Sequence, residues 1–107
     1  MEKLILVTGS SRYDFKDEKT GRSITGTKVN YIDFSAQKVE EDVKGYVVST
    51  ETIEYHRFHE VENGCGFYRV NIGFDLTGKK PKVIFEKLTF VVSVDLGDLV
   101  NKLPKSA

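Results

Sequence analysis

The strict alternation of side-chain character between Tyr68 and Leu76 is the feature that most limits how this chain folds. Tyr68, Val70, Ile72, Phe74 and Leu76 fall on one parity, and the residues between them are polar, charged or glycine. A period of two residues with one apolar face is typical of a half-buried antiparallel strand. We therefore expect a strand here, with Tyr68 and Phe74 in the core.

The rest of the chain divides into similar apolar segments separated by turn sequences. The turns are expected at Asp17–Arg22, at Asn63–Gly66, where Asn-Gly favours a hairpin, and at Thr77–Pro81. Further strands are expected over residues 2–16 with a bulge or bend at 9–11, 23–34, 43–50, 52–61 and 82–94. Residues 35–42 form a polar break with room for one helical turn, and residues 95–103 close with a short helix.

Five or six hairpin-connected strands must bury their apolar faces by curling into a barrel or by pairing two sheets. An immunoglobulin-like sandwich has about seven shorter strands, so the barrel fits better. We predict an all-β fold: a five-stranded OB-type Greek-key barrel with a long protruding hairpin over residues 12–34. It forms a single domain over residues 1–103, and residues 104–107 form a frayed tail.

Charge and composition bear on the possible ligands and the cellular compartment of the protein. The net charge is zero, but residues 12–28 hold five bases against three acids, whereas residues 37–62 are rich in acids. No apolar run approaches the ~18 residues of a membrane span, and the run after Lys3 is too short for a signal peptide. A single cysteine, Cys65, excludes an intramolecular disulfide and fits a reducing compartment. We expect a cytoplasmic protein.

Catalytic and metal-binding patterns are weak. His56, His59 and Cys65 are the only soft metal-ligand candidates, and on a strand the two histidines point to opposite sides. Nothing in the sequence places a base beside Cys65 to activate it as a nucleophile. We therefore expect no enzyme activity, no metal and no cofactor.

Aromatic and basic residues interleave on the expected hairpin and again near residue 57. Cations that follow phosphates, together with rings on which bases stack, are the requirements for binding single-stranded nucleic acid. Core packing is the competing interpretation for the rings, above all for Phe15 and Phe34. The candidate binding residues are Arg12, Tyr13, Phe15, Lys16, Lys19, Arg22, Lys28, Tyr31, Tyr55, Arg57, Phe58, Lys79 and Lys80.

The hairpin also resembles a known family. Tyr13-Asp14-Phe15, followed by Thr20-Gly21-Arg22-Ser23-Ile24-Thr25-Gly26-Thr27-Lys28-Val29-Asn30-Tyr31, is similar to small phage and mobile-element single-stranded-DNA-binding proteins of the filamentous-phage helix-destabilising group. The detailed likeness covers residues 13–31, and the rest agrees in architecture alone.

The resemblance implies a two-fold dimer that coats single-stranded DNA cooperatively and without sequence choice during phage or plasmid replication. It implies phosphate contacts for Arg22 and Lys28 and a stacking or groove-lining role for Tyr31. Lys16 and Lys19 match only as basic positions of the hairpin tip. The acidic stretch 37–62 departs from the pattern, and acids on the face of Tyr55, Arg57 and Phe58 would suit a dimer interface better than DNA.

Three functions remain open at this point. The first is the coat on single-stranded DNA, with single-stranded RNA as a related ligand. The second is a non-catalytic protein-interaction module, such as a phage structural or adaptor protein. The third is a small enzyme whose site is assembled from dispersed residues.

Overall fold

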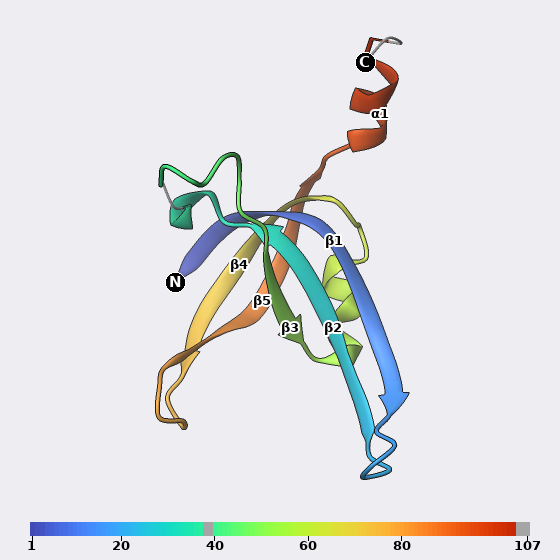
Figure 1. Ribbon diagram of the computed structural model, residues 1–107, viewed down its shortest axis with the longest axis vertical. Helices are drawn as coiled ribbons and strands as arrows, with labels where there is room; N and C mark the ends of the chain where they lie inside the picture. Colours follow the sequence, from blue (N-terminus) through green and yellow to red (C-terminus); the bar gives the residue numbers. More distant parts are fainter. Residues whose placement is uncertain (38–39, 105–107) are drawn as a thin grey trace.

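The structure is a computed structural model that describes residues 1–37 and 40–104. It is mostly β, with five strands, two 3-10 helices and one short α-helix (Figure 1). In chain order the elements are β1 (Glu2–Lys16), β2 (Ser23–Ile32), η1 (Phe34–Ala36), β3 (Ser49–Ile53), η2 (Tyr55–Val61), β4 (Gly66–Asp75), β5 (Lys82–Ser93) and α1 (Leu96–Asn101).

The five strands form one antiparallel sheet in the order β3-β2-β1-β4-β5. Within it β4 lies beside β1, and β1, β2 and β3 follow one another, which is the 4-1-2-3 order of a Greek key. The all-β class, the five strands and their antiparallel pairing are confirmed.

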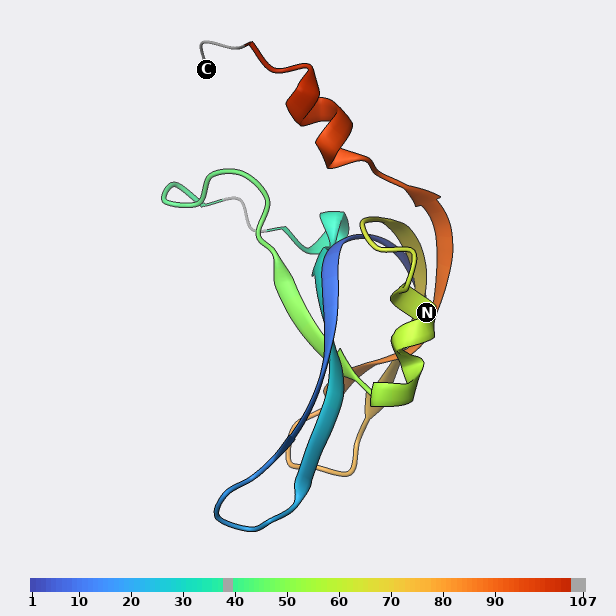
Figure 2. The same ribbon diagram turned by 90° about the vertical axis from the view of Figure 1, so that its right-hand side faces the viewer.

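The sheet does not close into a barrel, so that part of the prediction is wrong. Its two edges are β3 and β5, and the described part of the chain has no ladder that joins them. The physical reason lies in β3, which is only five residues long. Instead, η2 lies between the two sides of the curved sheet, where it contacts β1, β2 and β5 (Figure 2).

The turn of the long β1–β2 hairpin lies at residues 17–22, as the sequence predicts. A backbone N–H from Gly21 and one from Asp17 close the turn at 17–22, and Gly21 has the positive φ of 69° that glycine adopts readily. The carboxylate of Asp17 accepts from the backbone N–H of Lys19 and the hydroxyl of Thr20. A register shift between Val7 and Gly9 forms a bulge in β1, directly before the residues 9–11 at which it was expected.

The predicted strands 43–50 and 52–61 are wrong over most of their length, since only residues 49–53 of this stretch form a strand, β3. Residues 43–48 are not a strand, because the side-chain amide of Gln37 both donates to and accepts from the backbone of Val47. Residues 55–61 form η2 rather than a strand, and Arg57 bonds acids three residues away on either side. Asn63-Gly64 therefore turns the chain from η2 into β4, not between two strands, with Gly64 at a φ of 75°.

The core lies on the concave face of the sheet, under η2. It consists of Ile5, Val7, Val29, Ile53, Val61, Tyr68, Val70, Ile72, Phe85 and Leu88. Tyr68 is buried as predicted, but Phe74 is 57% exposed, because the β4–β5 hairpin continues beyond the core.

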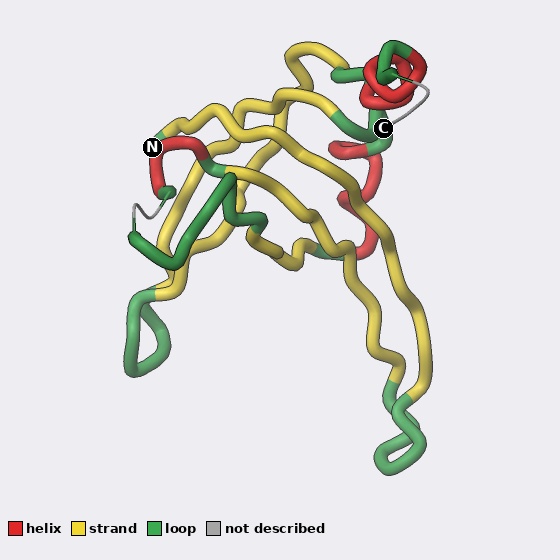
Figure 3. The backbone as a smooth tube through the Cα atoms, turned by 45° about the horizontal axis from the view of Figure 1, so that its top comes forward, coloured by secondary structure: helices red, strands yellow, loops and turns green. Residues whose placement is uncertain are grey.

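Two hairpins project from this core as separate arms, β1–β2 and β4–β5 (Figure 3). After β5 the expected C-terminal helix is present as α1. Asp95 caps this helix, because its carboxylate accepts a hydrogen bond from the backbone N–H of Asp98. Residues 105–107 of the predicted tail lie outside the described residues. No helix in the part of the chain described here is long and apolar enough to cross a membrane.

Candidate nucleic-acid interface

The register of the β1–β2 hairpin decides which of its side chains share a face. Directly opposite residues of an antiparallel pair lie on the same face, and successive residues alternate. We call one side the outer face; it consists of the cross-strand pairs Ser11–Lys28, Tyr13–Gly26 and Phe15–Ile24. The opposite side, which continues into the concave face of the sheet, carries the pairs Arg12–Thr27, Asp14–Thr25 and Lys16–Ser23.

The outer face holds a shallow hollow of about 380 Å³ that is lined by Ser11, Tyr13, Phe15, Ile24 and Lys28. Phe15 is 53% exposed, so it does not fill the core. Its ring centroid lies 6.0 Å from that of Tyr13, with 37° between the ring planes. Three of the predicted residues, two rings and one cation, thus meet in one hollow.

Arg12 lies on the opposite side of the hairpin and faces η2. Its guanidinium carbon lies 5.0 Å from the ring centroids of both Tyr55 and Phe58. Such cation–π contacts orient the guanidinium without neutralising it. The two rings are half-buried, both contact Arg12, and Phe58 also packs against the core.

The cations of the hairpin have no ion-pair partner within the part of the chain that the structure describes. Lys16, Lys19, Arg22 and Lys28 are exposed, and none of the ion pairs recorded for residues 1–37 and 40–104 involves them or Arg12. The nearby Asp17 is engaged in the turn. Exposed cations without a carboxylate partner are suited to contact phosphates.

Arg57, in contrast, makes ion pairs and hydrogen bonds within the fold. Its side chain is 13% exposed and donates to the carboxylates of Glu54 and Glu60, at 2.9 and 2.6 Å, and to the backbone oxygen of Phe85 at 2.7 Å. Glu60 also accepts from the backbone N–H of Leu88 at 2.8 Å. Arg57 and Glu60 thereby bond the backbone of edge strand β5, so we do not place Arg57 in the interface.

The pKa values of this cluster reflect the same contacts. Burial opposes ionisation of Glu60, but the hydrogen bonds from Arg57 and Leu88 outweigh it and lower the pKa of Glu60. The hydrogen bond to Glu60 is the main reason why the pKa of Arg57 is raised. The hydrogen bond from Arg57 also lowers the pKa of Glu54. Glu54 and Glu60 are among the acids that spoke against a DNA contact of this segment in the sequence. In the structure they neutralise Arg57.

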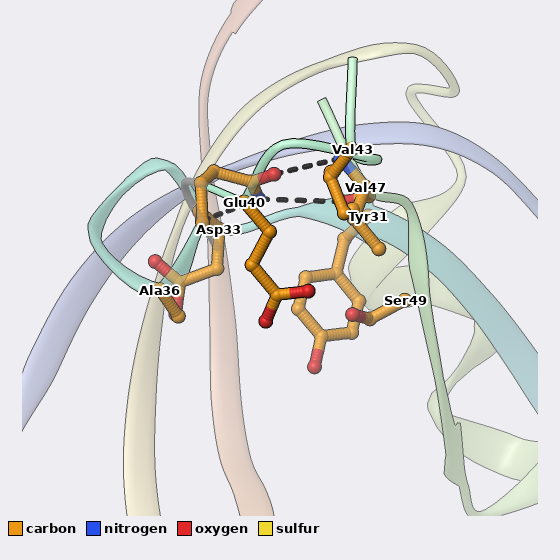
Figure 4. A pocket seen from close by; sticks show the side chains of 8 residues that line it. Tyr31, Asp33, Ala36, Glu40, Val43, Val47 and Ser49 are labelled. Atoms are coloured by element: carbon orange, nitrogen blue, oxygen red, sulfur yellow. Dashed lines mark hydrogen bonds between the residues drawn. The ribbon is translucent and has the colours of Figure 1, made fainter. Parts of the chain in front are cut away.

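Tyr31 lies on the concave face, not with the hollow. Its ring packs against Phe85, with centroids 5.1 Å apart. It also lines a pocket of about 420 Å³ together with Asp33, Ala36, Gln37, Glu40, Val43, Val47 and Ser49 (Figure 4). Burial and then the charges of Glu51 and Asp33 raise the pKa of Tyr31. A pocket with carboxylates on its wall repels phosphate, so Tyr31 does not join the interface.

Lys79 and Lys80 are exposed in the turn between β4 and β5. Figures 1 and 3 show the tips of the two projecting hairpins well apart, so these lysines lie away from the hollow. His56 and His59 are exposed in η2. Among the residues that the structure describes, no three or more His, Cys, Asp or Glu side chains are grouped to hold a metal ion.

Sequence reasoning missed Ser11, Ile24 and Gly26 as parts of this face. The predicted turn over 17–22 was enough to identify them, because it pairs Lys16 with Ser23 and, three residues further from the turn, Tyr13 with Gly26.

Comparisons with models of protein families, with curated proteins and with solved structures found no match to this chain.

Proposed function

We propose that this protein binds single-stranded DNA, without sequence preference, through the outer face and the free cations of the β1–β2 hairpin. The observation that carries the proposal is the hollow in which Tyr13, Phe15 and Lys28 meet. Two neighbouring rings offer stacking surfaces to unpaired bases, and the amine of Lys28 offers a charge to the phosphate between them.

The rest of the proposal follows from the resemblance of residues 13–31. We propose that the fold is an OB-type sheet left open between β3 and β5. We also propose that the protein is a homodimer that coats single-stranded DNA during phage or plasmid replication, in the cytoplasm of the host. In this proposal Arg12 is a phosphate contact that Tyr55 and Phe58 orient. Lys16, Lys19 and Arg22 attract the strand at the hairpin tip.

Removal of one ring tests the proposal. Phe15→Ala deletes an exposed ring, and each stacked base contributes about 1–3 kcal/mol, so we expect a matching loss of affinity for oligo-dT in a fluorescence-anisotropy titration. Phe74→Ala is the matched control, because Phe74 is 57% exposed on the other projecting hairpin. Equal losses for both variants, or binding of duplex as tight as of oligo-dT, contradict the proposal.

A protein-interaction module is the second candidate, and exposed apolar side chains favour it. Val92, Leu99 and Val100 are 51%, 54% and 62% exposed near the C-terminal end. Binding through such a surface would depend weakly on salt, because few charges are neutralised. A steep salt dependence of oligo-dT binding therefore separates the two functions.

A further inference from the structure

Gly26 is the one outer-face residue without a side chain, and its backbone does not explain why. Positive φ among the described glycines occurs at Gly21, Gly45 and Gly64, and Gly26 is not one of them. Its conformation is therefore open to any residue. Glycine inside a strand also weakens the strand, since it loses the most conformational freedom on folding. A reason other than backbone geometry must account for this glycine.

The reason is the ring of Tyr13, which lies across β2 at this point. A Cβ atom built on Gly26 would lie 2.7 Å from Cζ and 3.1 Å from Cε1 of Tyr13, and closer still to the hydroxyl. Gly26 is buried although residues 8–25 around the hairpin tip include no buried residue, which agrees with a ring that covers it. The phenol thus occupies the space where any other side chain would be.

We infer that Gly26 is a positioning residue for Tyr13, which it allows to lie flat enough across β2 to form a wall of the binding hollow. A methyl group at position 26 would force the ring away from the strand, because an aromatic ring cannot bend around it. Tyr13 would then no longer face the hollow beside Phe15. This inference rests on the proposed function, which gives Tyr13 its role.

A double-mutant cycle tests the inference, with Kd for oligo-dT as the first readout. Tyr13→Ala removes one stacking ring, and we expect a loss of roughly 5- to 150-fold in affinity. Gly26→Ala should lose most of that factor although it deletes no ring. In the Tyr13→Ala background, Gly26→Ala should cause no further loss, because the ring that it displaces is already absent.

Thermal stability is the second readout, and it does not depend on DNA. In the Tyr13→Ala background, Gly26→Ala should raise the Tm, since alanine suits a strand better than glycine and nothing obstructs it. With Tyr13 present, the same substitution should raise the Tm less or lower it. Gly9→Ala is the control: a Cβ at Gly9 has no atom within 4 Å, so its effect should be equal in both backgrounds.

The outcomes separate this inference from the proposed function. Equal changes of Tm on Gly26→Ala in both backgrounds, or an unchanged Kd on Gly26→Ala when Tyr13→Ala weakens binding, would overturn the positioning role and leave the proposed function standing. If Tyr13→Ala leaves the Kd unchanged, the proposed contact of Tyr13 with DNA is wrong, and the Tm cycle alone decides whether Gly26 positions the ring.

Discussion

Thr27 shows how a single hydroxyl connects two elements. It is the only buried polar or charged side chain recorded among residues 1–37 and 40–104, and it lies opposite Arg12 in the hairpin. Its hydroxyl lies 3.2 Å from the backbone oxygen of Glu54 and 3.3 Å from that of Tyr55, so its one proton is shared between these two acceptors. Thr27 therefore fixes the start of η2 against β2, and with it the ring of Tyr55 under Arg12.

Thr27→Val should destabilise the protein. Valine keeps the shape of threonine but removes the hydroxyl donor from the carbonyl oxygen of Tyr55, while that of Glu54 keeps the backbone N–H of Arg57. The loss of a donor in a buried site costs about 1–3 kcal/mol. The free energy of unfolding from urea denaturation measures this loss. Thr25→Val is the control on the same strand and the same face, but exposed, so its effect should stay within about 0.5 kcal/mol. Equal effects of the two substitutions contradict the role of Thr27.

Individual contacts were partly predictable from the sequence. Interleaved rings and cations on the hairpin identified Tyr13, Phe15 and Lys28, which the fold brings into one hollow. The face on which a ring points depends on register, and the bulge between Val7 and Gly9 changes the parity of β1 between the core and the hairpin. Tyr31 lies away from the hollow for the related reason that its parity on β2 is that of the buried Val29.

At the scale of elements, the hairpins were predictable and η2 was not. The aromatic residues of 55–61 are typical of a strand, yet Arg57 bonds Glu54 and Glu60, three residues before and after it. In a 3-10 helix, side chains three residues apart lie directly above one another. The spacing of these three charges was therefore the one helical signal in the segment.

The contacts of η2 with β5 predict a pH dependence of stability. The folded-state pKa of Glu60 is lowered, so its contribution is fully present above the unfolded-state value of about 4.3 and is lost as the pH falls through the folded-state value. We expect the free energy of unfolding to fall on acidification below about pH 5. Glu60→Gln should flatten this dependence, because glutamine keeps a hydrogen-bonding oxygen without a charge that titrates.

Glu62→Gln is the matched control for this pH profile. Glu62 is exposed and lies two residues further along the chain, directly after η2. Its substitution should leave the acid limb of the profile as steep as in the unaltered protein. If Glu60→Gln leaves that limb unchanged as well, the carboxylate of Glu60 does not stabilise the fold.

At the scale of the whole molecule, net charge and charge distribution give opposite expectations for DNA. The chain is neutral overall, yet one hairpin carries five cations that are absent from the recorded ion pairs: Arg12, Lys16, Lys19, Arg22 and Lys28.

Closure of the sheet is likewise a property of the whole molecule. It depends on how far β3 extends beside β2, and the apolar residues at 43–48 gave a misleading length.

Oligo-dT affinity should fall log-linearly with salt, with a slope of about −0.7 for each phosphate neutralised. Lys19→Ala and Arg22→Ala should each make the slope shallower by up to about 0.7, because each removes a free cation. Lys102→Ala is the control, since its amine pairs with Asp98 on α1, at 3.0 Å. A slope that none of the three substitutions changes would remove the hairpin tip from the contact.

The lack of any buried residue from 8 to 25 has a consequence for how this protein diversifies. Core packing does not constrain that stretch, so substitutions there can alter ligand preference at little cost to the folded state. Recognition and folding therefore depend on separate sets of residues in this chain, the first on the ribbon and the second on the side chains beneath η2.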